Sequence, residues 1–349
     1  MNQSEPTDSI GISLSETELE GYQTIAKSSG IIDLSTRSRI CVIGEDRTRF
    51  LHGQVTNDIK GLPTWSGSYA ALVNGKGKFE TDLHVIVLEN ELLLDFEPDL
   101  TEQIIKRLDT YVIADDVEMV DVAPHYGLFH IAGPLALKSV QGVFNNCFDN
   151  ANDSTVLKTN FDEGEVYLYQ HQRFGIPGVD VFAPDAQKEA IYSALCKACA
   201  DSGGGKVQDT AFNAHRIESG VPRFGIDMDS SNLAPEAGIT DRAISYAKGC
   251  YIGQEVIARI RTYGKVTKAL RGLVLTGEGL PPSKSEIFNE DKKVGYLTSV
   301  LDSPKIGSAI ALGYVRKECN DIGQSLVVKT PDSSWDATIV ELPFEAPER

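Results

Sequence analysis

Eight consecutive residues bring a thiol, an ammonium, a phenol, a carboxamide and a carboxylate together, in the order Lys248-Gly249-Cys250-Tyr251-Ile252-Gly253-Gln254-Glu255. Ile257 and Ile260 follow at helical spacing, and Gly264 stands where a helix would end. The spacing therefore predicts a glycine-shaped turn that leads into a short helix beginning near Gly253.

Among the side chains of this stretch, the thiol of Cys250 can take part in the largest number of reaction types. We expect it just ahead of a helix N-terminus, two residues from the Lys248 ammonium. Both a positive helix end and a nearby cation favour a thiolate over a thiol. The flanking glycines would let the backbone come close to a ligand. Cys250 is therefore a candidate catalytic residue, and the alternative is a loop cysteine with solvated neighbours.

The stretch KGCYIGQE resembles the signature of the YgfZ-type folate-binding proteins. These are relatives of the glycine-cleavage T-protein, a tetrahydrofolate-dependent aminomethyltransferase. Residues 33–58, 74–83 and 216–225 resemble the same proteins. The resemblance implies a central cleft for tetrahydrofolate or a folate derivative, with Cys250 beside it. It implies cofactor-binding roles for Lys248, Tyr251, Gln254, Glu255, Arg216, Glu218 and Asn74.

The resemblance also points to a candidate acid. In the aminomethyltransferases, an aspartate of an acidic pair acts beside the folate amine, and the corresponding pair here is Thr81-Asp82. A carboxylate next to a protonated amine can stabilise a developing iminium ion and help to move a proton. Because side chains alternate along a strand, only one of the two can face the cleft. Asp82 is therefore a candidate catalytic residue, and the chemistry would be lost if Thr81 faced the cleft instead.

Two further positions bear on folate binding. The planar fork of Arg216 matches the glutamyl carboxylate of a folate, and the alternative is a charge on a helix surface. The turn Gly175-Ile176-Pro177-Gly178 falls where the aminomethyltransferases carry an acidic turn that grips the pteridine ring. Ile176 cannot make those paired hydrogen bonds, which points away from true aminomethyl transfer.

Three functions remain open from the sequence. The first is a tetrahydrofolate-binding accessory protein of the YgfZ type, in which Cys250 works beside the folate. That family is linked to iron–sulfur cluster assembly or repair, so iron–sulfur proteins or assembly factors would be its clients and tRNA modification an indirect outcome. The second is a folate-dependent aminomethyltransferase of the glycine cleavage system, and the third is a non-catalytic folate-binding regulatory protein. The cysteine motif and the altered acidic positions favour the first.

The composition excludes several other classes. The net charge of −17 would repel nucleic acid, and no apolar run is long enough to span a membrane. The acidic, polar N-terminus resembles neither a secretory signal nor a transit peptide, so we expect a cytoplasmic protein. Cys196 and Cys199 form a CxxC inside a helical pattern, without the second pair that a zinc site needs. The histidines show no ligand spacing, and we expect no metal site.

The element pattern predicts an α+β protein in three parts. We expect an N-terminal tail and short helix over residues 1–30, then a two-part α+β folate-binding body over residues 31–265. Residues 266–349 contain five or six short strands and no helical pattern, which predicts a C-terminal β-barrel. The resemblance adds that the parts should form T-protein-like interlocking subdomains around the folate cleft.

Overall fold

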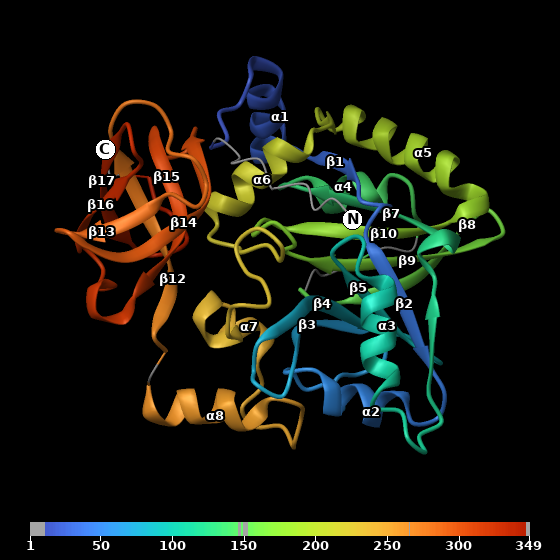
Figure 1. Ribbon diagram of the computed structural model, residues 1–349. Coiled ribbons are helices and arrows are strands. Elements are labelled where there is room, and N and C mark those ends of the chain that lie inside the picture. The colour runs from blue at the N-terminus through green and yellow to red at the C-terminus, as the bar shows by residue number, and fades with distance from the viewer. Residues whose placement is uncertain (1–10, 146–147, 149–152, 265, 347–349) are drawn as a thin grey trace, which may run out of the picture.

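Two β-sheets lie face to face with helices on their outer sides, and a separate β-barrel stands beside them (Figure 1). This arrangement comes from a computed structural model, which describes residues 11–145, 148, 153–264 and 266–346. The predicted fold class, a mixed helix-and-sheet body with a C-terminal barrel, is confirmed. No helix in these ranges is long and apolar enough to cross a membrane.

The first sheet is antiparallel and has the strand order β3-β4-β5-β2-β6. Its strands are β2 (Ser38–Ile43), β3 (Ser66–Val73), β4 (Phe79–Val87), β5 (Leu92–Phe96) and β6 (Glu118–Asp121). Two helices, α2 (Arg47–Gln54) and α3 (Thr101–Asp109), pack on its outer face. They bury Leu51 and Leu108 against strand residues such as Val85, as the apolar spacing of the two segments requires.

The second sheet has the order β11-β1-β7-β10-β9-β8 and is antiparallel except for the β1–β11 pair. Its strands are β1 (Gly30–Asp33), β7 (Tyr126–Ala132), β8 (Val156–Phe161), β9 (Gly164–His171), β10 (Gly178–Pro184) and β11 (Gly205–Lys206). Its outer face carries α4 (Ala136–Gln141) and α5 (Lys188–Asp201). Cys199 of the CxxC is buried in α5 with Ile191 and Leu195, as their spacing predicts.

The inner faces of the two sheets share a core of their own. Ile86 and Leu93 of the first sheet pack against Leu128 and Phe182 of the second. The body is therefore a four-layer sandwich, with helix, sheet, sheet and helix in succession (Figure 1). Side chains that alternate toward this inner space are the ones able to meet a ligand held between the sheets.

Six strands close the C-terminal barrel in the order β12-β15-β14-β13-β16-β17. They are β12 (Lys268–Thr276), β13 (Glu286–Asn289), β14 (Lys292–Ser303), β15 (Ser308–Arg316), β16 (Ser325–Lys329) and β17 (Ser334–Val340). The helices α1 (Glu16–Lys27) and α6 (Asp209–Glu218) lie between barrel and body (Figure 1). Tyr22 and Ile217 join Leu301 and Leu312 of the barrel in one apolar cluster.

In the described part of the chain, the remaining helical segments are α7 (Thr240–Ala243), α8 (Gln254–Tyr263) and the 3-10 turns η1 (Ala123–His125), η2 (Asp185–Gln187), η3 (Ala234–Ala237) and η4 (Lys317–Cys319). Part of the N-terminal tail (1–10) lies outside the described residues. So does part of residues 145–155, which are rich in asparagine and aspartate and are predicted from the sequence to form a surface loop.

Candidate functional site

A cleft of about 680 Å³ opens between the two sheets. That volume lies inside the range of roughly 300–1,000 Å³ that is usual for small-molecule sites. Strand β4 supplies Asp82 and His84 to its wall, and strand β9 supplies Tyr169 and His171. The residues between α6 and α7 close another side.

Asp82, not Thr81, faces this cleft. In β4 every second side chain from Phe79 to Val85 is buried, so Thr81 is fully buried and Asp82 points to the opposite face. The Tyr69 hydroxyl donates a hydrogen bond of 2.6 Å to Asp82 Oδ2. Burial raises the pKa of Asp82 to about 6, although the Tyr69 hydrogen bond acts to lower it. A carboxyl group with that pKa can give and take protons near neutral pH.

Flat rings gather around this acid. Tyr69 and His84 lie with ring centroids 5.2 Å apart, and His84 lies 4.5 Å from His171. Tyr169 stacks on His171 at 4.3 Å with an angle of 10° between the planes. Burial lowers the pKa of His84 and of His171, so both imidazoles stay neutral at physiological pH. The wall beside Asp82 is therefore aromatic and uncharged.

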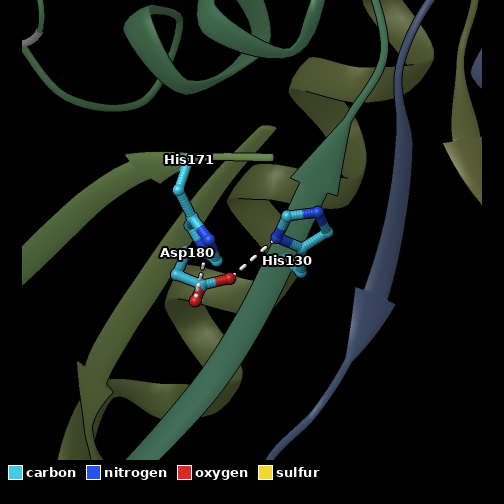
Figure 2. Close-up of side chains that lie close together, drawn as sticks. All are labelled: His130, His171 and Asp180. Carbon is cyan, nitrogen blue, oxygen red and sulfur yellow. Dashed lines mark hydrogen bonds and ion pairs between the residues drawn. The ribbon is translucent and has the colours of Figure 1, made fainter. Parts of the chain in front are cut away.

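Two buried histidines share one buried carboxylate behind the wall. His130 Nδ1 lies 2.7 Å from Asp180 Oδ1, and His171 Nε2 lies 2.8 Å from Asp180 Oδ2 (Figure 2). The three residues stand on β7, β9 and β10, and His130 lies 50 positions before Asp180 in the sequence. Arg173 pairs with the same carboxylate. Burial alone would raise the pKa of Asp180, but Arg173 and the histidines hold it well below its usual value.

The same three side chains have the composition of a metal site, which the sequence did not predict. However, Asp180 already receives hydrogen bonds from both imidazoles, and its negative charge is matched by the Arg173 guanidinium. A metal ion would have to displace all of these partners. We therefore assign the cluster a structural role, in which it fixes the ring of His171 at the cleft wall.

Charge pairs continue from Asp180 across the cleft. Arg173 also pairs with Asp95 of the first sheet at 2.7 Å, and Asp95 pairs with Arg37 at 2.9 Å. Arg37 contacts Glu97 at 2.6 Å, and Glu97 contacts Arg223 at 3.0 Å. This relay joins the second sheet to the first and then to the segment after α6. It holds the cleft walls together and neutralises the arginines within it.

Arg216 and Glu218 do not have the free ligand-binding groups that the sequence suggested. Arg216 lines the cleft, but its guanidinium is buried and pairs with Asp227 at 2.6 Å. Glu218 is not among the lining residues, and it accepts hydrogen bonds from Tyr22 and from Ser303 of the barrel. Both residues therefore fasten α6 to its neighbours.

The motif at 248–255 is built largely as an anchor. Lys248 Nζ donates to the backbone carbonyls of His52, Val55 and Asn57 at 2.6 to 2.8 Å, at the C-terminal end of α2. Burial lowers the pKa of this ammonium to about 8. Cations stabilise helix C-termini, so the role of Lys248 is to fix the motif on α2 rather than to contact a ligand.

Other motif residues serve the same purpose. Tyr251 is buried in a cluster with Phe79 and Ile257. Gly253 has a φ of 81°, and a Cβ there would come 2.5 Å from the carbonyl oxygen of Asn74. Asn74 itself folds the β3–β4 turn by accepting hydrogen bonds from two later backbone N–H groups. None of these residues is among those that line the cleft.

Cys250 is exposed, and it is also absent from the lining residues of the cleft. Gln254 donates to the Gly249 carbonyl oxygen at 3.2 Å, and Glu255 is exposed. As predicted, α8 begins directly after Gly253 and ends at Gly264. The expectation of Cys250 beside a folate in the cleft is therefore corrected, because Cys250 does not line the cleft and Lys248 ties its loop to the end of α2, on the outer face of the first sheet.

The residues that the sequence analysis missed are Tyr69, the ring wall and Arg242. The β3–β4 hairpin pairs Tyr69 with His84 and Ala71 with Asp82, which brings Tyr69 diagonally across from the acid. This register depends on a shift between Leu72 and Val73, so the glycine-rich turn alone does not predict it. Nothing in the local sequence signals Arg242, which reaches the cleft from α7.

The match to known proteins covers most of the chain. Residues 13–248 match the GCVT N-terminal domain, and residues 268–345 match the glycine cleavage T-protein C-terminal barrel domain. A putative chloroplastic transferase of Arabidopsis thaliana is 30% identical over 309 residues, which is 85% of this chain and 68% of the relative. An aminomethyltransferase of Staphylococcus saprophyticus is 25% identical over 330 residues, with 92% and 88% covered.

A solved structure has the same fold. The glycine cleavage system aminomethyltransferase T of Bartonella henselae superposes with a TM-score of 0.85. The alignment covers 93% of this chain and 89% of that protein at 18% sequence identity. The likeness at this identity concerns the fold alone.

Proposed function

The chain belongs to the glycine cleavage T-protein family, whose N-terminal and barrel domains it carries, and on this premise we propose that it transfers one-carbon units on a reduced folate. The folate binds in the cleft between the sheets, and Asp82 is its proton-handling residue. The proposal favours aminomethyl transfer over the cysteine-centred role suggested by the motif at 248–255.

The observation that carries the proposal is the placement of Asp82. Its carboxyl group faces the cleft, accepts a hydrogen bond from Tyr69, and has a pKa raised by burial to about 6. In its ionised form, such a group stabilises the positive charge that develops on the folate amine as the amine bonds to the incoming carbon and the bond between that carbon and its donor breaks. The carboxylate then takes the proton that the amine loses and becomes neutral. One acid of the expected pair is absent, but the acid that remains is the one in the cleft.

The uncharged ring wall supports a flat heterocycle as the ligand. Tyr69, His84, Tyr169 and His171 present aromatic faces or edges within one patch next to Asp82. Aromatic partners of this kind bind planar rings by stacking and edge-to-face contact. Ile176 is not among the lining residues, so its lack of polar groups does not count against a pterin ring in this cleft.

The first test is direct titration of the purified protein with tetrahydrofolate, followed by intrinsic fluorescence or calorimetry. Turnover is then measured with an aminomethyl-charged lipoyl carrier protein, by the appearance of 5,10-methylenetetrahydrofolate. We expect Asp82→Asn to slow turnover about 10²- to 10⁴-fold, the usual contribution of general acid–base catalysis. Cys250→Ser is the matched control, and it should leave the rate unchanged. A rate that survives Asp82→Asn contradicts the proposal.

A second candidate is the YgfZ-type accessory role in iron–sulfur cluster assembly or repair. One observation favours it, which is that Cys250 is exposed on a loop whose neighbours Lys248 and Tyr251 are buried anchors. Such a loop could offer its thiol to a client protein at the surface rather than to the folate. Loss of iron–sulfur enzyme activity in cells carrying Cys250→Ser, but not Asp82→Asn, would favour this candidate over aminomethyl transfer.

A further inference from the structure

Arginines dominate the positive charge of the cleft, and nearly all of them are already paired. Four of the lining arginines lie within 3.0 Å of a carboxylate oxygen, in the pairs Arg37–Asp95, Arg173–Asp95, Arg216–Asp227 and Arg223–Glu97. A ligand anion could bind one of these only by displacing a protein carboxylate that is already in place. These arginines are therefore poor candidates for holding an anionic ligand.

Arg242 differs from the others. It lines the cleft, its side chain is exposed, and within the described part of the chain it makes no ion pair. Its Cζ lies 5.2 Å from the centroid of the Tyr69 ring, which is a cation–π distance. This contact orients the guanidinium while leaving its N–H groups available.

The backbone of Arg242 is also fixed. Asn57 Nδ2 donates to the Arg242 carbonyl oxygen at 3.0 Å and to the Tyr69 carbonyl oxygen at 2.9 Å. The amide of Asn57 thus ties α7 to β3 at the point where the two side chains meet. The fixed backbone and the contact with the Tyr69 ring restrict the guanidinium, which reduces the conformational entropy lost on binding an anion.

We propose that Arg242 anchors a carboxylate of the cleft ligand. The inference rests on the proposed function, under which the ligand is a reduced folate and the carboxylates are those of its glutamyl tail. The guanidinium fork matches a carboxylate with two parallel hydrogen bonds. This assigns to Arg242 the part that the sequence analysis gave to Arg216.

Tyr69 then stands between the two ends of the ligand. Its hydroxyl contacts Asp82, and its ring face carries Arg242. A ligand anchored by its carboxylate at Arg242 would extend past Tyr69 and bring its amine toward Asp82. Arg242 is therefore a specificity-determining residue, which separates folates from pterins that lack a glutamyl tail.

The test compares tetrahydrofolate with 6-methyltetrahydropterin, which has no carboxylate, by calorimetric titration. We expect Arg242→Gln to weaken tetrahydrofolate binding about tenfold or more, the usual loss for a hydrogen-bonded charge pair, and to leave the pterin unaffected. Arg259→Gln is the matched control, since Arg259 is an exposed arginine on α8 outside the cleft. Equal tetrahydrofolate affinity in Arg242→Gln and wild type would overturn the proposal.

A second measurement separates this inference from the proposed function. Phenylglyoxal modifies accessible arginines, and peptide mapping reports the rate at Arg242 in the wild-type protein. p-Aminobenzoylglutamate, which carries the tail without the pterin, should slow modification of Arg242 and not of Arg259. If tetrahydrofolate fails to bind while this protection is present, the proposed function fails and the anion site stands. If p-aminobenzoylglutamate does not slow the modification of Arg242, the proposal that Arg242 anchors a carboxylate is wrong, whether or not tetrahydrofolate binds.

Discussion

Removing the Tyr69 hydroxyl should raise the pKa of Asp82. In the wild-type protein, burial raises the pKa of Asp82 to about 6, and the 2.6 Å hydrogen bond from Tyr69 works in the opposite direction. Tyr69→Phe keeps the ring and its packing against His84 but removes this donor. Without this hydrogen-bond donor, the ionised carboxylate of Asp82 is less stable relative to its neutral form, so its pKa rises.

The size of the pKa change follows from the strength of the hydrogen bond between Tyr69 and Asp82. A hydrogen bond to a charged group contributes about 1.5–3 kcal/mol, and about 1.4 kcal/mol corresponds to one pKa unit. Asp82 is only partly buried, and water entering the cleft can replace some of the lost interaction. We therefore expect a rise of roughly one unit, to near 7, at the low end of that range. Near pH 7, about half of the Asp82 groups would then be protonated, against about a tenth in the wild type.

Carbon-13 NMR of protein labelled at the aspartate carboxyl carbon measures this pKa directly. The Asp82 resonance is the one that disappears in Asp82→Asn, and its chemical shift is followed from pH 4 to pH 9. Tyr263→Phe is the matched control, because Tyr263 is 67% exposed and distant from the cleft. An Asp82 pKa that is unchanged or lower in Tyr69→Phe would refute the reasoning. If Asp82 acts as a base, the acid limb of the rate profile should move upward by the same amount.

Three further outcomes follow from the structure. Burial lowers the pKa of His130 in the folded protein to about 4, below the value of about 6.5 in the unfolded chain. The contribution of His130 to the free energy of unfolding is therefore complete above about pH 6.5 and is lost as the pH falls toward 4. Thermal unfolding should show a loss of roughly 2 kcal/mol between pH 7 and pH 5 that is smaller in His130→Asn. Lys248→Met should cost about 2–4 kcal/mol in urea unfolding, because three carbonyl groups lose their donor, while exposed Lys60→Met should not. Gly253→Ala should cost about 1–3 kcal/mol in the same assay, since its φ is 81° and its Cβ would strike Asn74.

Local sequence patterns predicted the positions of helices and strands better than they predicted which strands pair with one another. The period of the apolar residues located α5 and the barrel strands, because each signal lies within a short stretch of chain. Strand β1 escaped prediction, since it is four residues long and its place in the second sheet depends on pairing with β7 and β11 from elsewhere in the chain.

The candidate site shows the same difference between local features, which the sequence indicates, and long-range contacts, which it does not. The family resemblance pointed to the Thr81-Asp82 pair, and the strand period showed that only one of the two can face the cleft. Which one does so is decided by the burial pattern of β4 in the folded protein. Sequence spacing could not show that Asp227 and Ser303 occupy the polar groups of Arg216 and Glu218. A conspicuous motif likewise need not be a binding site, since Lys248 is explained by the carbonyl groups of α2.

The cleft depends on a part of the chain that does not line it. Arg216 donates to Ser299 of the barrel at 3.0 Å, and Asp227 accepts from Ser299 and Thr298. No barrel residue is among those that line the cleft, yet these bonds hold its wall. During synthesis on the ribosome, Arg216 and Asp227 emerge before residue 299, so the barrel contacts of this wall form only after the last quarter of the chain has begun to fold. Until then the wall is held by the bonds within the body alone, and full ligand affinity would require the barrel as well.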